Sequence, residues 1–168
     1  MPLPSPIHPA LVHFPVALIL VSLLFTLIGR ALDRDWWRKA AAAMLVLGVL
    51  GLVAAYLTGG PAGDAAEKLG VAEQAVDDHE KGAVFSLWFG IATVVAMAAA
   101  GRVKKAAAAL GGLALLLHFL TAATVSVTAY RGGKLVFEHG AAVKVNGQPV
   151  THAKPGEGHG EREPGEKD

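Results

Sequence analysis

The sequence predicts an all-α integral membrane protein: an antiparallel bundle of four transmembrane helices, a short extramembrane hairpin-like segment, and a disordered tail. Hydrophobic residues make up 53% of its 168 positions and charged residues only 17%. So little charge at this length is untypical of a water-soluble domain. The apolar residues also gather into four runs, each close to the roughly 20 residues that cross a hydrocarbon core. In lipid each segment must pair its own backbone polar groups, which favours helices.

Four spans account for most of the chain. We expect them at residues 11–28, 40–58, 82–100 and 106–130. The first has neither the basic start nor the small-residue cleavage site of a secretory leader, so we expect it to be retained. Gly59-Gly60-Pro61 is expected to end the second span. Residues 59–81 then form an acidic loop, within which residues 65–79 could make a short surface helix.

The distribution of Lys and Arg predicts the orientation. The segments at residues 30–39 and 101–105 carry seven of these residues, whereas the loop at 59–81 carries two. Basic loops stay in the cytoplasm, so both termini and the acidic loop should face outward. Arg131 and Lys134 favour the opposite side, but the uncharged N-terminal segment is easy to translocate.

The C-terminal part divides into two pieces. Residues 131–152 contain alternating apolar residues around Asn146-Gly147, a pair that is typical of a hairpin turn. Residues 153–168 have almost no apolar content, and we expect them to be disordered. The domain organisation is therefore a four-helix domain with an ordered outer segment, residues 1–152, and a polar tail.

Small residues recur at helical spacing on three of the spans, which is how helices approach closely in lipid. The expected stripes are Gly48, Gly51, Ala55 and Gly59; His79, Gly82, Ala83, Ser86 and Gly90; and Ala107, Gly111, Ala114, His118, Ala122 and Ala129. Tight packing alone explains such stripes. A flat cofactor beside its ligand would also need small neighbours.

Histidines within or beside membrane spans are the candidate functional residues. His8 and His13 flank the start of the first span, His79 opens the third, and His139 follows the fourth. Each could instead be an interfacial or solvated side chain. If the topology is right, these four histidines converge at the outer ends of the helices. His152 and His159 are given no role.

His118 belongs to a different level of the bundle. It lies 12 residues before Tyr130, about 18 Å along a straight helix. That depth separates it from the outer group. A neutral histidine bonded to Thr121, Thr124 or a facing hydroxyl is the alternative interpretation.

The stretch Ile7-His-Pro-Ala-Leu-Val-His-Phe-Pro15, the histidine at 79, and Gly132-Gly-Lys-Leu-Val-Phe-Glu-His-Gly140 resemble a bacterial membrane family called domain of unknown function 2231. The resemblance covers residues 7 to about 143. It implies four spans in the bacterial inner membrane, with His8, His13, His79 and His139 as family positions. Some members carry the domain beside Rieske or cytochrome c domains, which implies respiratory electron transfer and a b-type haem.

The leading functional hypothesis is therefore a membrane b-type cytochrome, because haem iron binds imidazole and a bundle can hold the porphyrin between helices. His13 and His79 are the first expected pair of iron ligands. His8 and His139 would serve a second haem or its surroundings, and Glu80, Ser86 and Glu138 could orient a ligand imidazole.

Two other hypotheses stay open. Four imidazoles with nearby carboxylates also suit zinc or copper(II), and the chain could be a structural or assembly subunit. The expected partners are the lipid bilayer, a cytochrome c or Rieske-type redox protein, and a second copy of the chain. The absence of cysteine excludes thiolate metal sites and covalent c-type haem. No nucleic-acid pattern or catalytic spacing occurs, so a binding protein is favoured over an enzyme.

Overall fold

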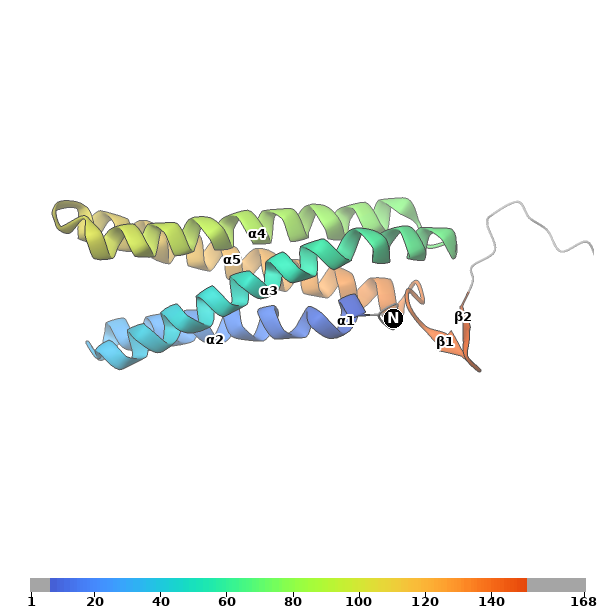
Figure 1. The fold of residues 1–168 in the computed structure, drawn as a ribbon, viewed down its shortest axis with the longest axis horizontal. Coiled ribbons are helices and arrows are strands. Elements are labelled where there is room, and N and C mark those ends of the chain that lie inside the picture. The colour runs from blue at the N-terminus through green and yellow to red at the C-terminus, as the bar shows by residue number, and fades with distance from the viewer. Residues whose placement is uncertain (1–6, 151–168) are drawn as a thin grey trace, which may run out of the picture.

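The structure, a computed structural model, describes residues 7–150. Four long helices lie side by side in an elongated bundle (Figure 1). In chain order the helical elements are α1 (Ile7–Leu11), α2 (His13–Ala31), α3 (Asp35–Lys68), α4 (Glu73–Arg102), a 3-10 turn η1 (Lys104–Ala106) and α5 (Ala107–Phe137). Within these residues, four helical segments are long and apolar enough to cross a membrane. The predicted all-α four-helix fold is confirmed.

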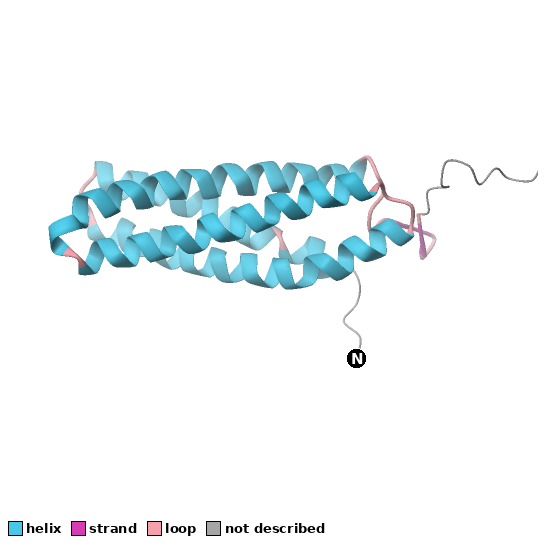
Figure 2. Cartoon of the chain, turned by 90° about the horizontal axis from the view of Figure 1, so that it is seen from above, coloured by secondary structure: helices cyan, strands magenta, loops and turns pink. Residues whose placement is uncertain are grey.

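The chain turns at both ends of the bundle, so neighbouring helices are antiparallel (Figures 1 and 2). One end holds the α2–α3 and α4–α5 connections. The other end holds the α3–α4 turn, the start of α1 and the C-terminal hairpin. Because this second end gathers α1, the start of α4 and the end of α5, we call it the histidine end. The opposite end, which contains Arg30, Arg38 and Arg102, is called the arginine end.

The first span is interrupted near its start. Helix α1 ends at Leu11 and α2 begins at His13. Pro15 has no N–H to donate to the carbonyl of Leu11, four residues earlier, and this explains the break. Pro15 itself is buried and lies against Gly51 of α3. The predicted effect of Pro15 on the helix is thus observed, although helix already begins at Ile7.

The expected break at Gly59-Gly60-Pro61 does not occur. Helix α3 continues through Pro61 to Lys68, and the acidic loop is two helix ends joined by a short turn. Packing accounts for the continuation, because a Cβ placed on Gly63 would lie 2.9 Å from Val76 Cγ1 of α4. The expected surface helix at 65–79 is therefore wrong. With 34 residues at ~1.5 Å each, α3 exceeds a hydrocarbon core of about 30 Å and must project beyond it.

The hairpin signalled by Asn146-Gly147 is present. Strands β1 (Lys144–Val145) and β2 (Gln148–Pro149) pair antiparallel. Asn146 and Gly147 have φ angles of 52° and 78°, as a two-residue type I′ turn requires at both positions. The helix before it extends to Phe137, seven residues past the expected end at Tyr130. The tail at 153–168, with His159, and His152 lie outside the described residues.

The small-residue stripes do face neighbouring helices. Gly48 approaches Ile19 of α2, and Gly90 approaches Val49 of α3. On α5 the expected stripe is only partly right, because Ala129 is exposed and Thr128 is buried in its place. Buried hydroxyls also meet between α4 and α5, where Thr93 and Thr121 Oγ1 atoms are 3.1 Å apart.

The outward faces of the helices are apolar, as a lipid environment demands. Large exposed side chains include Leu24, Leu50, Leu57, Trp88, Val95 and Leu116. At the arginine end, the rings of Trp36 and Trp37 are in contact, with centres 4.3 Å apart and planes tilted by 31°, and Phe25 packs edge-on against Trp37. Aromatic rings at this level suit the boundary between lipid and water.

Candidate functional site: a histidine pair

Two of the candidate histidines lie together at the histidine end. The rings of His8 on α1 and His79 on α4 have their centres 6.2 Å apart, with planes at 87°. Both side chains are half-buried. The two residues are 71 positions apart in the sequence, so only the fold of the bundle brings them into contact.

A threonine on α3 fixes the tautomer of His8. Nδ1 of His8 lies 3.1 Å from the hydroxyl oxygen of Thr58. That hydroxyl has a single proton, which it donates to the backbone carbonyls of Ala54 and Ala55 at 3.0 and 3.1 Å. We assign the imidazole proton to Nδ1, because Thr58 accepts from it in this arrangement and the Ala55 carbonyl beside the ring can also only accept. The lone pair of His8 is left on Nε2.

A backbone carbonyl on α5 does the same for His79. Nδ1 of His79 lies 3.1 Å from the carbonyl oxygen of Thr128. A carbonyl oxygen only accepts hydrogen bonds, so Nδ1 must be protonated here too. With Nδ1 protonated, each imidazole carries its lone pair on Nε2. This is the arrangement in which a metal-binding histidine is usually held.

Glycines make room for these rings. A Cβ on Gly132 of α5 would lie 2.9 Å from Cε1 of His79, and one on Gly59 of α3 would lie 3.4 Å from Cε1 of His8. Another close approach lies one turn along α4, where a Cβ on Gly82 would meet the Thr128 hydroxyl at 2.4 Å. Helices α4 and α5 therefore approach each other closely around His79.

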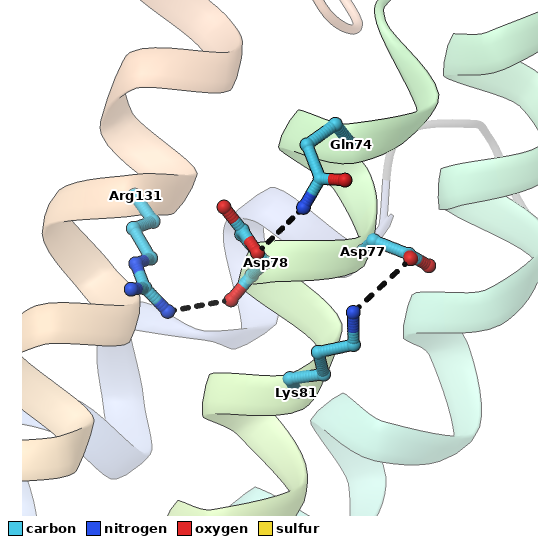
Figure 3. A network of polar contacts seen from close by, with 5 residues as sticks. All are labelled: Gln74, Asp77, Asp78, Lys81 and Arg131. Carbon is cyan, nitrogen blue, oxygen red and sulfur yellow. Dashed lines mark hydrogen bonds and ion pairs between the residues drawn. The ribbon is translucent and has the colours of Figure 1, made fainter.

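Polar contacts hold the surrounding helix turns in register (Figure 3). Arg131 of α5 donates to the backbone carbonyl of Asp78 at 2.8 Å, next to His79 in the chain. Within α4, Gln74 donates to the Asp78 carboxylate at 3.0 Å, and Lys81 pairs with Asp77 at 3.2 Å. The Arg131 bond ties α5 to the turn of α4 that carries His79.

The other two expected site histidines are not part of this ring contact. His13 is exposed in the first turn of α2, so the structure pairs His8, and not His13, with His79. His139 is half-buried and lines a hollow of about 360 Å³ together with Asp78, Arg131 and Lys134. Among residues 7–150, no three His, Asp or Glu side chains come close enough to hold a metal ion.

Comparison with known proteins places the chain in a family. A family described as "predicted membrane protein (DUF2231)" matches residues 4–145. The chain belongs to this family. Its membership agrees with the resemblance carried by the two histidine-containing stretches at either end of the matched region. No curated protein and no solved structure matches the chain.

Some residues that shape the site are missed by sequence reasoning. Thr58 and the Thr128 carbonyl orient the imidazoles, in place of the expected Glu80, Ser86 and Glu138. The Ser86 hydroxyl instead donates to the Gly82 carbonyl at 2.8 Å. A backbone carbonyl leaves no trace in a sequence. The spacing of Thr128 and Gly132, one helical turn apart, is the pattern that could have marked this face of α5.

Proposed function

We propose that this chain is a membrane b-type cytochrome-like protein in which His8 and His79 bind one haem iron for electron transfer. The observation that carries the proposal is the pair itself: two neighbouring imidazoles, each with Nδ1 bonded to the protein, which leaves the lone pair on Nε2. Haem iron with two imidazole ligands has no open position, which suits electron transfer.

The separation of the rings supports a single ion between them. Imidazole–metal bonds are about 2.0–2.1 Å long, and each ring nitrogen lies roughly 1 Å from its ring centre, so opposed ligands have centres about 6 Å apart. The 6.2 Å between the ring centres has this length, and iron binding would require both Nε2 atoms to turn toward each other from the edge-on contact that the rings now make.

The number of protein ligands favours haem over zinc or copper. A structural zinc site takes four protein ligands, and a catalytic site takes three. Within the described residues no group of three or more candidate ligands is present. Haem needs only two side chains, because its macrocycle supplies the remaining nitrogens.

The family and the charge pattern suggest where such a protein would work. With the basic segments in the cytoplasm, the histidine pair lies near the outer face of the bacterial inner membrane. A cytochrome c or Rieske-type protein on that side is the expected redox partner. His8 and His79 would hold the iron, while Thr58 and the Thr128 carbonyl would set the direction of their Nε2 atoms.

Absorption spectra of the purified protein, oxidised and reduced, test the proposal. The wild type, expressed with added haem precursor, should show the bands of six-coordinate haem. His8→Ala and His79→Ala should each lower the haem content by at least about tenfold. Losing an iron ligand should weaken haem binding more than losing a group that only orients a ligand, which already costs about 10- to 100-fold. His13→Ala is the matched control and should retain the spectrum.

Each other outcome has a definite meaning. A wild type without haem contradicts the cytochrome proposal, whether or not elemental analysis finds zinc or copper in it. A wild type with neither, folded normally, would favour a structural subunit. If His13→Ala loses the haem while His8→Ala keeps it, the pairing of His8 with His79 is wrong.

A further inference from the structure

A cavity of about 160 Å³ lies at the arginine end of the bundle, away from the histidine pair. All four long helices contribute to it. Its lining consists of Thr26, Arg30, Arg38, Met97, Ala100, Gly111, Ala114, Leu115 and His118. On α5 the lining residues run from Gly111 to His118, a rise of ~10 Å along the helix.

The deep end of this cavity, nearest the middle of the bundle, contains polar atoms that lack good hydrogen bonds. His118 is only 1% exposed, and neither of its ring nitrogens forms a hydrogen bond of good geometry among the described residues. The backbone carbonyl of Ile19 on α2 lies close to the ring, but Ile19 does not line the cavity. The hydroxyl of Thr26 is likewise buried and unpaired, whereas those of Thr93 and Thr121 bond to the carbonyl four residues earlier. Buried polar groups of this kind usually meet a water molecule or a ligand.

The mouth of the cavity, at the tip of the arginine end, is positively charged. Arg30 is held across it by donating to the Gly111 carbonyl at 2.6 Å, and within residues 7–150 it forms no ion pair. Arg38 is partly neutralised by an ion pair with Asp33. No Asp or Glu of the described chain lines the cavity. The charge at this end therefore matches an anion.

The size and walls of the cavity indicate a small organic molecule. A cavity of about 150 Å³ in another protein holds benzene, so 160 Å³ has room for a six-membered ring. Met97, Ala114 and Leu115 give it apolar sides. Chloride or phosphate alone would leave these walls and the inner polar atoms without contacts.

We propose that this cavity is a binding site for a small organic monocarboxylate with a second polar group at its far end. The carboxylate lies against Arg30, the apolar body lies between α4 and α5, and the second group bonds to His118 and Thr26. A hydroxyl serves this role well, because neutral histidine offers one donor and one acceptor. The site is separate from the histidine pair and does not depend on haem binding.

Three probes of the same shape test both ends of the site. Binding would be measured by titration calorimetry with the full chain in phosphatidylcholine nanodiscs. 4-Hydroxybenzoate carries both groups, benzoate lacks the hydroxyl, and 4-hydroxybenzamide lacks the charge. We expect 4-hydroxybenzoate to bind about fivefold more tightly than either analogue, since one hydrogen bond or one partly exposed charge contributes that much.

Two variants assign the preferences to residues. Arg30→Gln should remove the preference for the charged probe, and His118→Phe should remove the preference for the hydroxyl. Arg102→Gln changes an exposed arginine at the same end that does not line the cavity, and it should change neither. Arg30 is exposed, so its variant stays informative even if His118→Phe unfolds. Equal binding of charged and uncharged probes, or no binding of any probe, would overturn the proposal.

Discussion

At the scale of single residues, the two imidazoles of the pair are fixed through their Nδ1 atoms. Thr58 accepts from His8 and the Thr128 carbonyl accepts from His79, at 3.1 Å in both cases. The partners come from α3 and α5, while the histidines come from α1 and α4. A shift of α3 or α5 that moves either acceptor would therefore change the direction in which Nε2 points. Such outer partners commonly change metal affinity by ~10- to 100-fold.

Gly132 gives a residue-scale prediction. In Gly132→Ala the new Cβ would lie 2.9 Å from Cε1 of His79, so the imidazole or the helix must move. We expect a loss of about 1–3 kcal/mol in stability, as for other overpacked sites, and weaker haem retention. Thermal unfolding in detergent and the absorption spectrum would measure the two effects.

Gly133→Ala is the matched control. Nothing lies within 4 Å of a Cβ at this position, and alanine in a helix is more stable than glycine by roughly 0.5–1 kcal/mol. This variant should be slightly stabilised and keep its spectrum. Equal behaviour of the two variants would mean that α5 does not approach His79 as described.

The sequence named the histidines of the candidate site, whose binding role stays a prediction, but it did not indicate which two of them are in contact. His8, His13, His79 and His139 all follow from the motifs, and His118 was correctly placed deeper in the bundle. The choice between His8 and His13 depends on which side of a proline-broken helix faces α4. That direction is set by Pro15 packing against Gly51 of α3, a contact between residues 36 positions apart.

At the scale of elements, α3 shows tertiary packing overriding the helix-breaking tendency of glycine and proline. Proline inside a helix removes one hydrogen bond and costs about 3 kcal/mol. The sequence Gly59-Gly60-Pro61 therefore predicts the end of the helix. The structure carries the helix on to Lys68, because Ala66 packs with Val71 and Val76 in a small apolar cluster. The four apolar runs were predictable from composition, whereas the lengths of α3, α4 and α5 beyond the membrane depend on contacts between distant segments.

Two glycines on this part of α3 provide the element-scale prediction. Gly60 has nothing within 4 Å of its Cβ position, whereas a Cβ on Gly63 would meet Val76 Cγ1 at 2.9 Å and Glu80 Oε1 at 2.8 Å. Gly60→Ala should stabilise the protein by roughly 0.5–1 kcal/mol, and Gly63→Ala should destabilise it. Chemical unfolding of both variants would check this. A neutral effect at both positions would favour a flexible loop at 59–63 instead of a continuous helix.

At the scale of the whole molecule, the two ends of the bundle differ in character. The histidine end carries the acidic α3–α4 connection and the paired imidazoles, and the arginine end carries a basic surface with Trp36 and Trp37. Helices α3 and α4 extend past the apolar spans at the histidine end, so we expect the α3–α4 turn and the hairpin to stand outside the lipid. If the protein carries electrons as we propose, this placement would let a redox partner reach the pair without entering the bilayer.

Orientation is the prediction that belongs to this scale. Seven Lys and Arg residues lie in the two connections at the arginine end, which should keep that end in the cytoplasm. The chain has no cysteine, so single cysteines can report the side of each loop. Ala65 and Leu32 are suitable positions, because both are exposed, whereas the neighbouring Ala66 is buried.

In intact cells, a membrane-impermeant maleimide should label Ala65→Cys and leave Leu32→Cys unlabelled until the membrane is opened. Val145→Cys, on the hairpin and 60% exposed, should behave like Ala65→Cys, because β1 lies at the same end of the bundle. The reverse pattern would place the histidine pair on the cytoplasmic side. It would also turn the arginine-end cavity outward, so that its carboxylate ligand would come from outside the cell. Labelling of all three positions in intact cells would contradict a bundle that spans the membrane from end to end.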